Sequence, residues 1–484
     1  MTNITDLPEE VLQIMAAYLP GTDLKSLLLS CKDMNRELVK SELLRSIDWK
    51  FSRDNGSKSP DETMTVAYGH KLALKVSGDS AFAGKVRCLR LHYEHCPKCR
   101  PTRSYSNDGL SCHEISTDLM ASLVKVKELS LVEGDVGSLS KGFPLPPNLE
   151  ILQLEALMVK SYWTFHVAIS NLVPVLRHPK LRSLAIVGAH VTCYEPEQFY
   201  DEDGPATKIP NGLLSKITSL RLDDVSVESA TLADLLSHMN ALKIFEFTRS
   251  YSNIPRRFPS GRFISLQDVN LALQQIRNTV EVVRLTYADQ VRHRDEETTL
   301  DFSAFAKLKT LTIDPSMLLG YRSCRGDAKT NCDFPYEPLS TLSSRLSESL
   351  QELELAIDLE QCARVPKYRE EILQGLLSQR ATLPNLRRIV FRESRKTQSE
   401  PDCHCERRRP PPKRSNNICP PKSDLIKNPE RRYELIYRDS PPISIEQAAR
   451  FAEYAEEFRK IGVQLALVSE KNKGQRRPRR RIRR

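Results

Sequence analysis

The sequence predicts an α/β protein in which three short N-terminal helices precede a long solenoid of parallel strands. Three observations lead to this fold class. Apolar residues recur at helical spacing over residues 5–45. From residue 86 onward, one apolar pattern returns ten times in the same form. The chain between its copies is long enough for the crossover that must connect successive parallel strands.

Composition and charge restrict the class of protein. Of the 484 residues, 40% are hydrophobic and 28% are charged, as in soluble globular proteins. The net charge of +10 comes from the tail, because residues 471–484 hold nine Lys or Arg and no acid, which leaves +1 for the rest. No stretch reaches the roughly 18 apolar residues of a membrane helix, and no secretory signal opens the chain. We therefore expect no membrane partner, reduced cysteines, and a cytoplasmic or nuclear location.

Residues 5–45, within the N-terminal segment 1–50, are predicted to form three short helices. Asp6 can cap the first helix, which Pro20-Gly21 ends, and Asp23 can cap the second. Three helices of this length bury little apolar area alone, so we expect them to dock on a partner. Their apolar stripe consists of Val11, Leu12, Met15, Leu19, Leu24, Leu27, Leu28, Cys31 and Met34.

The residue order of this segment resembles the F-box family. The family's usual motifs occur here in sequence as Leu7-Pro8 with Glu10, Leu19-Pro20, Asp23-Leu24 and Cys31-Lys32. Met34 stands where the family often has Trp, which is larger. The resemblance implies a Skp-type adaptor, itself bound to a cullin and a RING subunit, as the partner of Leu7, Pro8, Val11, Leu12, Met15, Leu19, Leu24, Leu27, Leu28, Cys31 and Met34. The alternative is an unrelated helical subdomain.

The repeated pattern is apolar, two others, apolar, one other, apolar. Its last part alternates with period two, which predicts a short strand with one buried face. Pro147-Asn148 and Pro384-Asn385 place turn residues immediately before two of the copies. Such units are typical of leucine-rich repeats, with strands on a concave face and helices and loops on the convex face. The copies are Val86-Leu89-Leu91, Val126-Leu129-Leu131, Leu149-Leu152-Leu154, Leu181-Leu184-Ile186, Ile217-Leu220-Leu222, Leu242-Phe245-Phe247, Val280-Val283-Leu285, Leu308-Leu311-Ile313, Leu350-Leu353-Leu355 and Leu386-Ile389-Phe391.

The spacing of the copies predicts helices between the strands. The copies begin 23 to 42 residues apart, mostly more than in regular leucine-rich repeats. The expected convex-side helices cover 162–176, 228–239, 265–277 and 368–379. An F-box followed by divergent leucine-rich repeats is a layout common in fungi, and the chain resembles such proteins. A two-layer α/β domain with evenly patterned strands is the alternative.

The domain organisation follows from these patterns and from a change of composition after Phe391. Nine of the thirty prolines fall within residues 401–442, which predicts a flexible insertion. Beyond it, Phe451 and Phe458 suit a helix that Gly462 ends, and a strand follows. The predicted parts are 1–50 F-box, 51–85 connecting segment, 86–397 solenoid, 398–442 Pro-rich basic insertion, 443–469 terminal helix and capping strand, and 470–484 basic tail.

Two groups of residues are candidate sites outside the N-terminal helices. The strands should present side chains to solvent between their apolar residues, and these are candidate substrate contacts: Arg221, Glu246, Thr310 and Glu354. Two thiolates spaced as Cys96 and Cys99 can share a zinc ion that Cys112 and His113 complete. Free cysteines in a surface loop are the alternative interpretation.

The sequence carries no GxSxG, Walker or HExxH motif, so we expect no enzyme. The expected function is substrate recognition in an SCF-type ubiquitin ligase, with the repeats binding a protein substrate. One alternative is an F-box scaffold that acts with the adaptor outside ubiquitin transfer. Another is a nucleic-acid-associated protein that uses the basic tail, although the nearly neutral body argues against nucleic-acid contacts beyond that tail.

Overall fold

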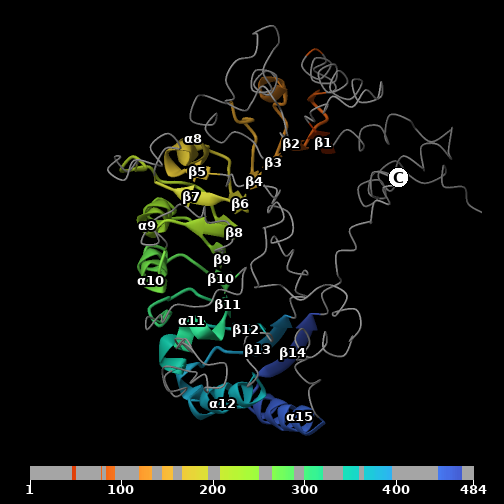
Figure 1. The fold of residues 1–484 in the computed structure, drawn as a ribbon, viewed down its shortest axis with the longest axis vertical. Helices are drawn as coiled ribbons and strands as arrows, with labels where there is room; N and C mark the ends of the chain where they lie inside the picture. The colour runs from red at the N-terminus through yellow and green to blue at the C-terminus, as the bar shows by residue number, and fades with distance from the viewer. Residues whose placement is uncertain are drawn as a thin grey trace, which may run out of the picture. The chain divides into compact units, whose positions relative to one another are not determined.

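The computed structural model divides the chain into two compact units, Met1–Arg292 and His293–Arg484, each described here by itself. Both units are α/β, with open sheets of parallel strands (Figure 1). Among the described residues, no helix combines the length and the apolar character needed to cross a membrane. The structure describes residues 46–50, 78, 83–92, 119–132, 144–155, 166–193, 208–249, 264–287, 299–319, 342–358, 365–394 and 445–470.

The sheet of the first unit follows the order of the chain. Its strands run β1-β2-β3-β4-β6-β8-β9-β10, and every one of these pairings is parallel. From β2 onward, neighbouring strands are therefore successive copies of the predicted pattern. The strand bounds are β1 Ser46–Lys50, β2 Cys88–His92, β3 Glu128–Val132, β4 Ile151–Glu155, β6 Ser183–Val187, β8 Ser219–Val227, β9 Ile244–Arg249 and β10 Val282–Tyr287.

The strands pair in the register that the pattern predicts. The second apolar residue of each copy lies opposite the second of the next, as Leu152 lies opposite Leu184, and the third residues pair in the same way. Every apolar position of the ten copies is at most 3% exposed. Each fully buried Leu, Val, Ile or Phe contributes about 1.5–3 kcal/mol relative to exposure, so these ladders are the core of both sheets.

Strand β1 corrects the predicted N-terminal boundary. Residues 46–50 were assigned to the F-box segment 1–50, beyond its predicted helices, but they form a strand that pairs with β2, with Ile47 opposite Leu89 and Trp49 opposite Leu91. Leu44, Ile47 and Trp49 have the same spacing as the ten copies. The sheet of the first unit thus begins before the predicted connecting segment 51–85.

A second, small sheet corrects the helix predicted over 162–176. That segment contains strand β5 His166–Ala168, the 3-10 helix η2 Ile169–Leu172 and only a five-residue helix, α8 Val173–Arg177. Pro174 lies in the first turn of α8, where its missing N–H is harmless, and it prevents the helix from extending through it. Strand β5 pairs with β7 His190–Thr192, which pairs with the end of β8.

Strand β8 joins the two sheets through a β-bulge. Its pairing with β9 shifts between Leu222 and Val225, and Asp224 adopts a φ of 53° there. The residues before the bulge pair with β6, and Ser226 and Val227 after it pair with β7. A bulge of this kind bends a strand, which here redirects β8 toward the small sheet.

Helices cover the apolar side of the sheet in the first unit, where α8, α9 and α10 lie on one side of the strands (Figure 1). Helix α9 is Ser229–Ser237 and α10 is Leu266–Gln274, within the predicted 228–239 and 265–277. Leu232 and Leu236 of α9 are fully buried, as is Ala272 of α10. The apolar stripes of these helices therefore close the core over the strand ladders.

The second unit has the same plan, with strand order β11-β12-β13-β14 and parallel pairings. Phe391 of β13 is fully buried and makes an edge-to-face contact with Phe451, at 6.4 Å between ring centroids. Phe458 on the same helix as Phe451 is also fully buried. The elements are β11 Thr310–Ile313, α11 Pro315–Leu319, η4 Ser343–Arg345, β12 Glu352–Asp358, α12 Val365–Ser378, η5 Arg380–Thr382, β13 Arg388–Ser394, α15 Ile445–Lys460 and β14 Gln464–Glu470.

Candidate partner-binding face

The residues between the paired apolar positions, which are polar on every strand except β6, lie in one row across the strands of the first unit. Parallel pairing without a shift keeps equivalent positions side by side, and successive residues of a strand face opposite sides. We call these residues the central row: Arg90, Ser130, Gln153, Ala185, Arg221, Glu246 and Arg284. The predicted contacts Arg221 and Glu246 are direct register partners within it.

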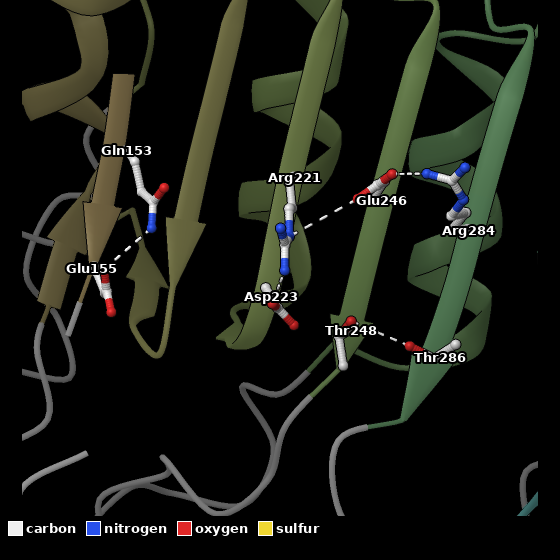
Figure 2. Close-up of polar contacts among 8 residues, drawn as sticks. All are labelled: Gln153, Glu155, Arg221, Asp223, Glu246, Thr248, Arg284 and Thr286. Carbon is white, nitrogen blue, oxygen red and sulfur yellow. Dashed lines mark hydrogen bonds and ion pairs between the residues drawn. The ribbon is translucent and has the colours of Figure 1, made fainter. Parts of the chain in front are cut away.

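The densest polar contacts of the central row lie on β8, β9 and β10. Arg284 forms an ion pair with Glu246, whose other carboxylate oxygen is 3.9 Å from Nε of Arg221. Arg221 also forms an ion pair with Asp223, two residues along its own strand. Figure 2 shows these side chains on the face of the strands opposite to the helices. Two arginines thus flank one carboxylate across three strands.

A second polar row lies two residues further along β4, β8, β9 and β10. On β9 and β10 it holds Thr248 and Thr286, and the Thr286 hydroxyl donates a hydrogen bond of 3.2 Å to Thr248 (Figure 2). On β4 it holds Glu155, which accepts from Gln153 at 3.2 Å and from Arg90 of β2 at 2.7 Å. The arginines of the central row are therefore held by carboxylates of either row.

The arginines of this face are more exposed than the carboxylates that hold them. The side chains of Arg221 and Arg284 are 53% and 50% exposed, whereas those of Asp223 and Glu246 are 28% and 26% exposed. Because both signs are present, the cluster of four side chains carries no net charge. Its outermost groups are nevertheless guanidinium groups, each with five N–H donors.

The second unit carries two similar pairs. Glu354 of β12, a predicted contact residue, pairs with Arg392 of β13 at 2.5 Å, and Glu352 pairs with Arg388 at 2.6 Å. The predicted contact Thr310 lies beside Glu352 rather than Glu354, whose register partner on β11 is Thr312. Thr310 is half-buried. Thr312, which lies between Leu311 and Ile313, is buried, so β11 offers neither threonine as a fully exposed contact.

Sequence reasoning found only some residues of this face. Arg221, Glu246 and Glu354 were predicted, but their partners Asp223, Arg284 and Arg392 were not. Arg284 lies between Val283 and Leu285, so the rule that selected Glu246 selects it as well. The pairing itself links residues 38 positions apart, which only the strand order brings together.

A different polar cluster is buried around Glu228, at the N-terminus of α9. One Glu228 carboxylate oxygen accepts hydrogen bonds from Oγ1 of Thr192 at 2.7 Å, from the backbone N–H of Cys193 at 3.1 Å and from its thiol at 3.3 Å. The buried His190 lies 4.0 Å from the other oxygen and contacts the Ser226 hydroxyl at 2.7 Å. Burial and Glu228 raise the pKa of the Cys193 thiol to about 11. This cluster connects the small sheet to α9.

The remaining predicted sites lie outside the described residues. These are the adaptor-binding residues from Leu7 to Met34 and the zinc candidates Cys96, Cys99, Cys112 and His113, so both stay predictions. Within the part of the chain that the structure describes, no three His, Cys, Asp or Glu residues gather so as to hold a metal ion. Nothing described therefore supports zinc.

The geometry of the face suits binding to another macromolecule. Side chains on parallel strands in register are held by the backbone at fixed spacing, and ion pairs restrict their rotamers before a partner arrives. Charged groups arranged in this way direct specificity and orientation.

In comparisons with known proteins, no family model matches the chain, and no curated protein matches it.

Proposed function

We propose that the chain is the substrate-recognition subunit of an SCF-type ubiquitin ligase. In this proposal the N-terminal helices form an F-box that binds a Skp-type adaptor, and the repeated strands belong to a leucine-rich-repeat solenoid that binds a protein substrate. The adaptor in turn joins the substrate to a cullin and a RING subunit.

The observation that carries the proposal is the in-register polar face of the first unit. Its central row is fixed on consecutive parallel strands, and its ion pairs leave guanidinium groups exposed. An array of fixed, exposed charges can orient a partner protein and discriminate between partners. The ordered motifs from Leu7-Pro8 to Cys31-Lys32 supply the second half of the argument, because they resemble the adaptor-binding module of the F-box family.

A receptor of this kind needs no catalytic residue of its own. It holds the substrate lysine close to the charged conjugating enzyme, which converts an encounter in solution into a reaction within one complex. We accordingly propose a non-enzymatic role. Catalysis would be supplied by the other subunits of the ligase.

Affinity purification of the full chain tests this function. Wild type should retain both the adaptor and a cullin, whereas the Leu7→Ala/Pro8→Ala double variant should lose both, because the side chains that begin the docking helix are removed. Pro210→Ala/Leu214→Ala is a matched control, since this Pro and Leu are exposed and lie outside the F-box segment. Equal recovery of adaptor and cullin with the Leu7/Pro8 variant would contradict the proposal.

The same experiment separates the scaffold alternative. Recovery of the adaptor without any cullin would mean that the F-box segment serves assembly and not ubiquitin transfer. Recovery of both, lost together in the double variant, supports the ligase.

A further inference from the structure

We propose that the face formed by β8, β9 and β10 binds a helix of the partner protein that carries two acidic side chains, two helical turns apart, over Arg221 and Arg284. The inference rests on the proposed role as a substrate receptor, and it specifies the chemistry of the substrate segment.

The ion pairs of Arg221 and Arg284 occupy only part of the two guanidinium groups. The contacts described above occupy one nitrogen of Arg284 and two of Arg221. Each group has five N–H donors, and each side chain is about half exposed. Donors therefore face solvent, while Asp223 and Glu246 hold the guanidinium groups in place from below. Carboxylates are the acceptors that match this donor geometry.

The separation of Arg221 and Arg284 matches two acidic side chains on one face of a helix. Arg221 and Arg284 are both register neighbours of Glu246, so they lie two strands apart. Two strand spacings are about 9.6 Å, and the Glu246 carboxylate already occupies the space between the two arginines. Two separate carboxylates of a partner are therefore needed to reach the outer donors of both. Residues i and i+7 of an α-helix are about 10.5 Å apart on one face of the helix. In an extended segment, residues i and i+3 are about 10 Å apart but face opposite sides. A helix crossing the strands is the regular element that fits.

An apolar pair of side chains lies beside the two arginines. Ile244 and Val282 are register partners, two residues before Glu246 and Arg284 on the same face, and both are partly exposed. A helix is about 10 Å wide, so one lying over the central row reaches this apolar pair. The partner helix should therefore carry apolar residues on one flank of its two acids.

The charge balance selects carboxylates over phosphates. Asp223 and Glu246 already neutralise the two arginines, so a doubly charged phosphate would meet two carboxylates at short range. A side-chain carboxylate brings a single charge and meets less repulsion at the same donors. We therefore assign unmodified Asp or Glu side chains to the partner.

Fluorescence anisotropy with the full chain tests this inference. The probe is a labelled, helix-stabilised peptide with Glu at i and i+7 and Leu at i+3 and i+10, which lie to one side of the acids. A second probe has Lys, and a third phosphoserine, in place of both Glu residues. We expect the Glu probe to bind wild type at least about tenfold more tightly than the Lys probe, with an affinity that falls as salt rises.

Two variants identify the site. Arg221→Gln/Arg284→Gln should weaken binding of the Glu probe about tenfold, the combined effect of two partly exposed charge pairs. Arg388→Gln, which removes an arginine of similar exposure from the second unit, should leave it unchanged. Arg284→Lys keeps the charge but loses the planar guanidinium fork, so it should weaken binding of the Glu probe. This single variant tests the site if the double variant does not fold.

The results that overturn the inference are specific. They are equal affinity for the Glu and Lys probes, no binding of the Glu probe to wild type, undiminished binding in the folded arginine variants, or tighter binding of the phosphoserine probe. Adaptor binding is measured separately on the same protein. Adaptor binding without probe binding would contradict this inference alone. Probe binding without adaptor binding would contradict the proposed function alone.

Discussion

At the scale of single residues, Glu228 shows how a buried charge can be stabilised where two sheets meet. Its carboxylate accepts from Thr192 and Cys193, which lie 35 or 36 positions earlier in the chain. These donors satisfy one of its two oxygens, while the other is buried without a hydrogen-bond partner among the described residues. The neighbouring thiol is disfavoured as an anion. The pKa of Cys193 is raised from 9.0 to about 11, with burial as the largest cause and Glu228 the next.

We predict that Cys193 reacts slowly with alkylating reagents in the folded chain. Only the thiolate reacts, and a pKa raised from 9.0 to about 11 lowers its fraction at pH 8.5 by roughly 10- to 100-fold. The folded state keeps the neutral thiol, so its contribution to stability is present below pH 9 and is lost as the pH rises through 11. Iodoacetamide labelling at pH 8.5, followed by peptide mass spectrometry, should show slower reaction in folded than in urea-unfolded protein.

Glu228→Gln removes the nearby negative charge and should increase the labelling rate of folded Cys193. The half-exposed Cys88, also a free thiol, serves as the internal control, because its rate should not depend on Glu228. Equal rates for Cys193 in the folded and unfolded chains would contradict the described environment.

At the scale of elements, α10 is the helix whose start is most clearly specified by local residues. The Ser265 hydroxyl accepts from the Asp268 N–H at 3.1 Å, and the Asp268 carboxylate accepts from the Ser265 N–H at 2.8 Å. This reciprocal capping box satisfies two N–H groups that the first turn leaves without helical partners.

Ser265→Ala should therefore destabilise α10 by about 1 kcal/mol. Hydrogen exchange of the amides in the first turn of α10 should become faster, while the exchange of β9 and β10 changes less. Ser237→Ala, which removes an exposed hydroxyl that bonds to Asp234 O at the end of α9, is the matched control and should have less than half the effect. Unchanged exchange in α10 would show that the capping box contributes nothing.

Most strands could be predicted from the sequence, whereas one strand and one helix could not. Copies such as Leu242-Phe245-Phe247 specify strand, face and register together, because one spacing satisfies all three. Strand β1 was missed because its single copy adjoins a helical pattern and is separated from the next copy by 51–85. The prediction of one helix over 162–176 was wrong, because the apolar residues there suit either period. Pro174 prevents the helix from extending toward its N-terminus. At the other end, His178 precedes Pro179 and is extended, which ends the helix at Arg177.

At the scale of the whole molecule, the candidate face could be predicted only in part. The alternation along each strand identified Arg221 and Glu246 as solvent-facing, since burial of one side fixes the other. Their ion pairs could not be predicted, because the partner strands are separated by crossovers of variable length. The bulge at Asp224, which lets β8 join two sheets, has no equivalent in the repeated pattern.

The basic tail accounts for nearly all the net charge of the molecule, and its removal should test the nucleic-acid alternative. Deleting 471–484 lowers the net charge from +10 to +1. We expect affinity for a heparin column or for random single-stranded DNA to fall at least about tenfold at 0.1 M salt, with a shallower salt dependence. Retention of tight, salt-dependent binding by the truncated chain would mean that the body itself binds polyanions.

The most direct test of the proposed receptor function is the affinity between the purified full chain and a purified Skp-type adaptor, measured by isothermal titration calorimetry. We predict a dissociation constant below about 1 µM for wild type and at least tenfold weaker binding for Leu7→Ala/Pro8→Ala. Met34→Trp should bind more tightly, because Trp buries more area at the position where the family often has it. Absence of binding by wild type, or equal affinities for wild type and the double variant, would contradict the account.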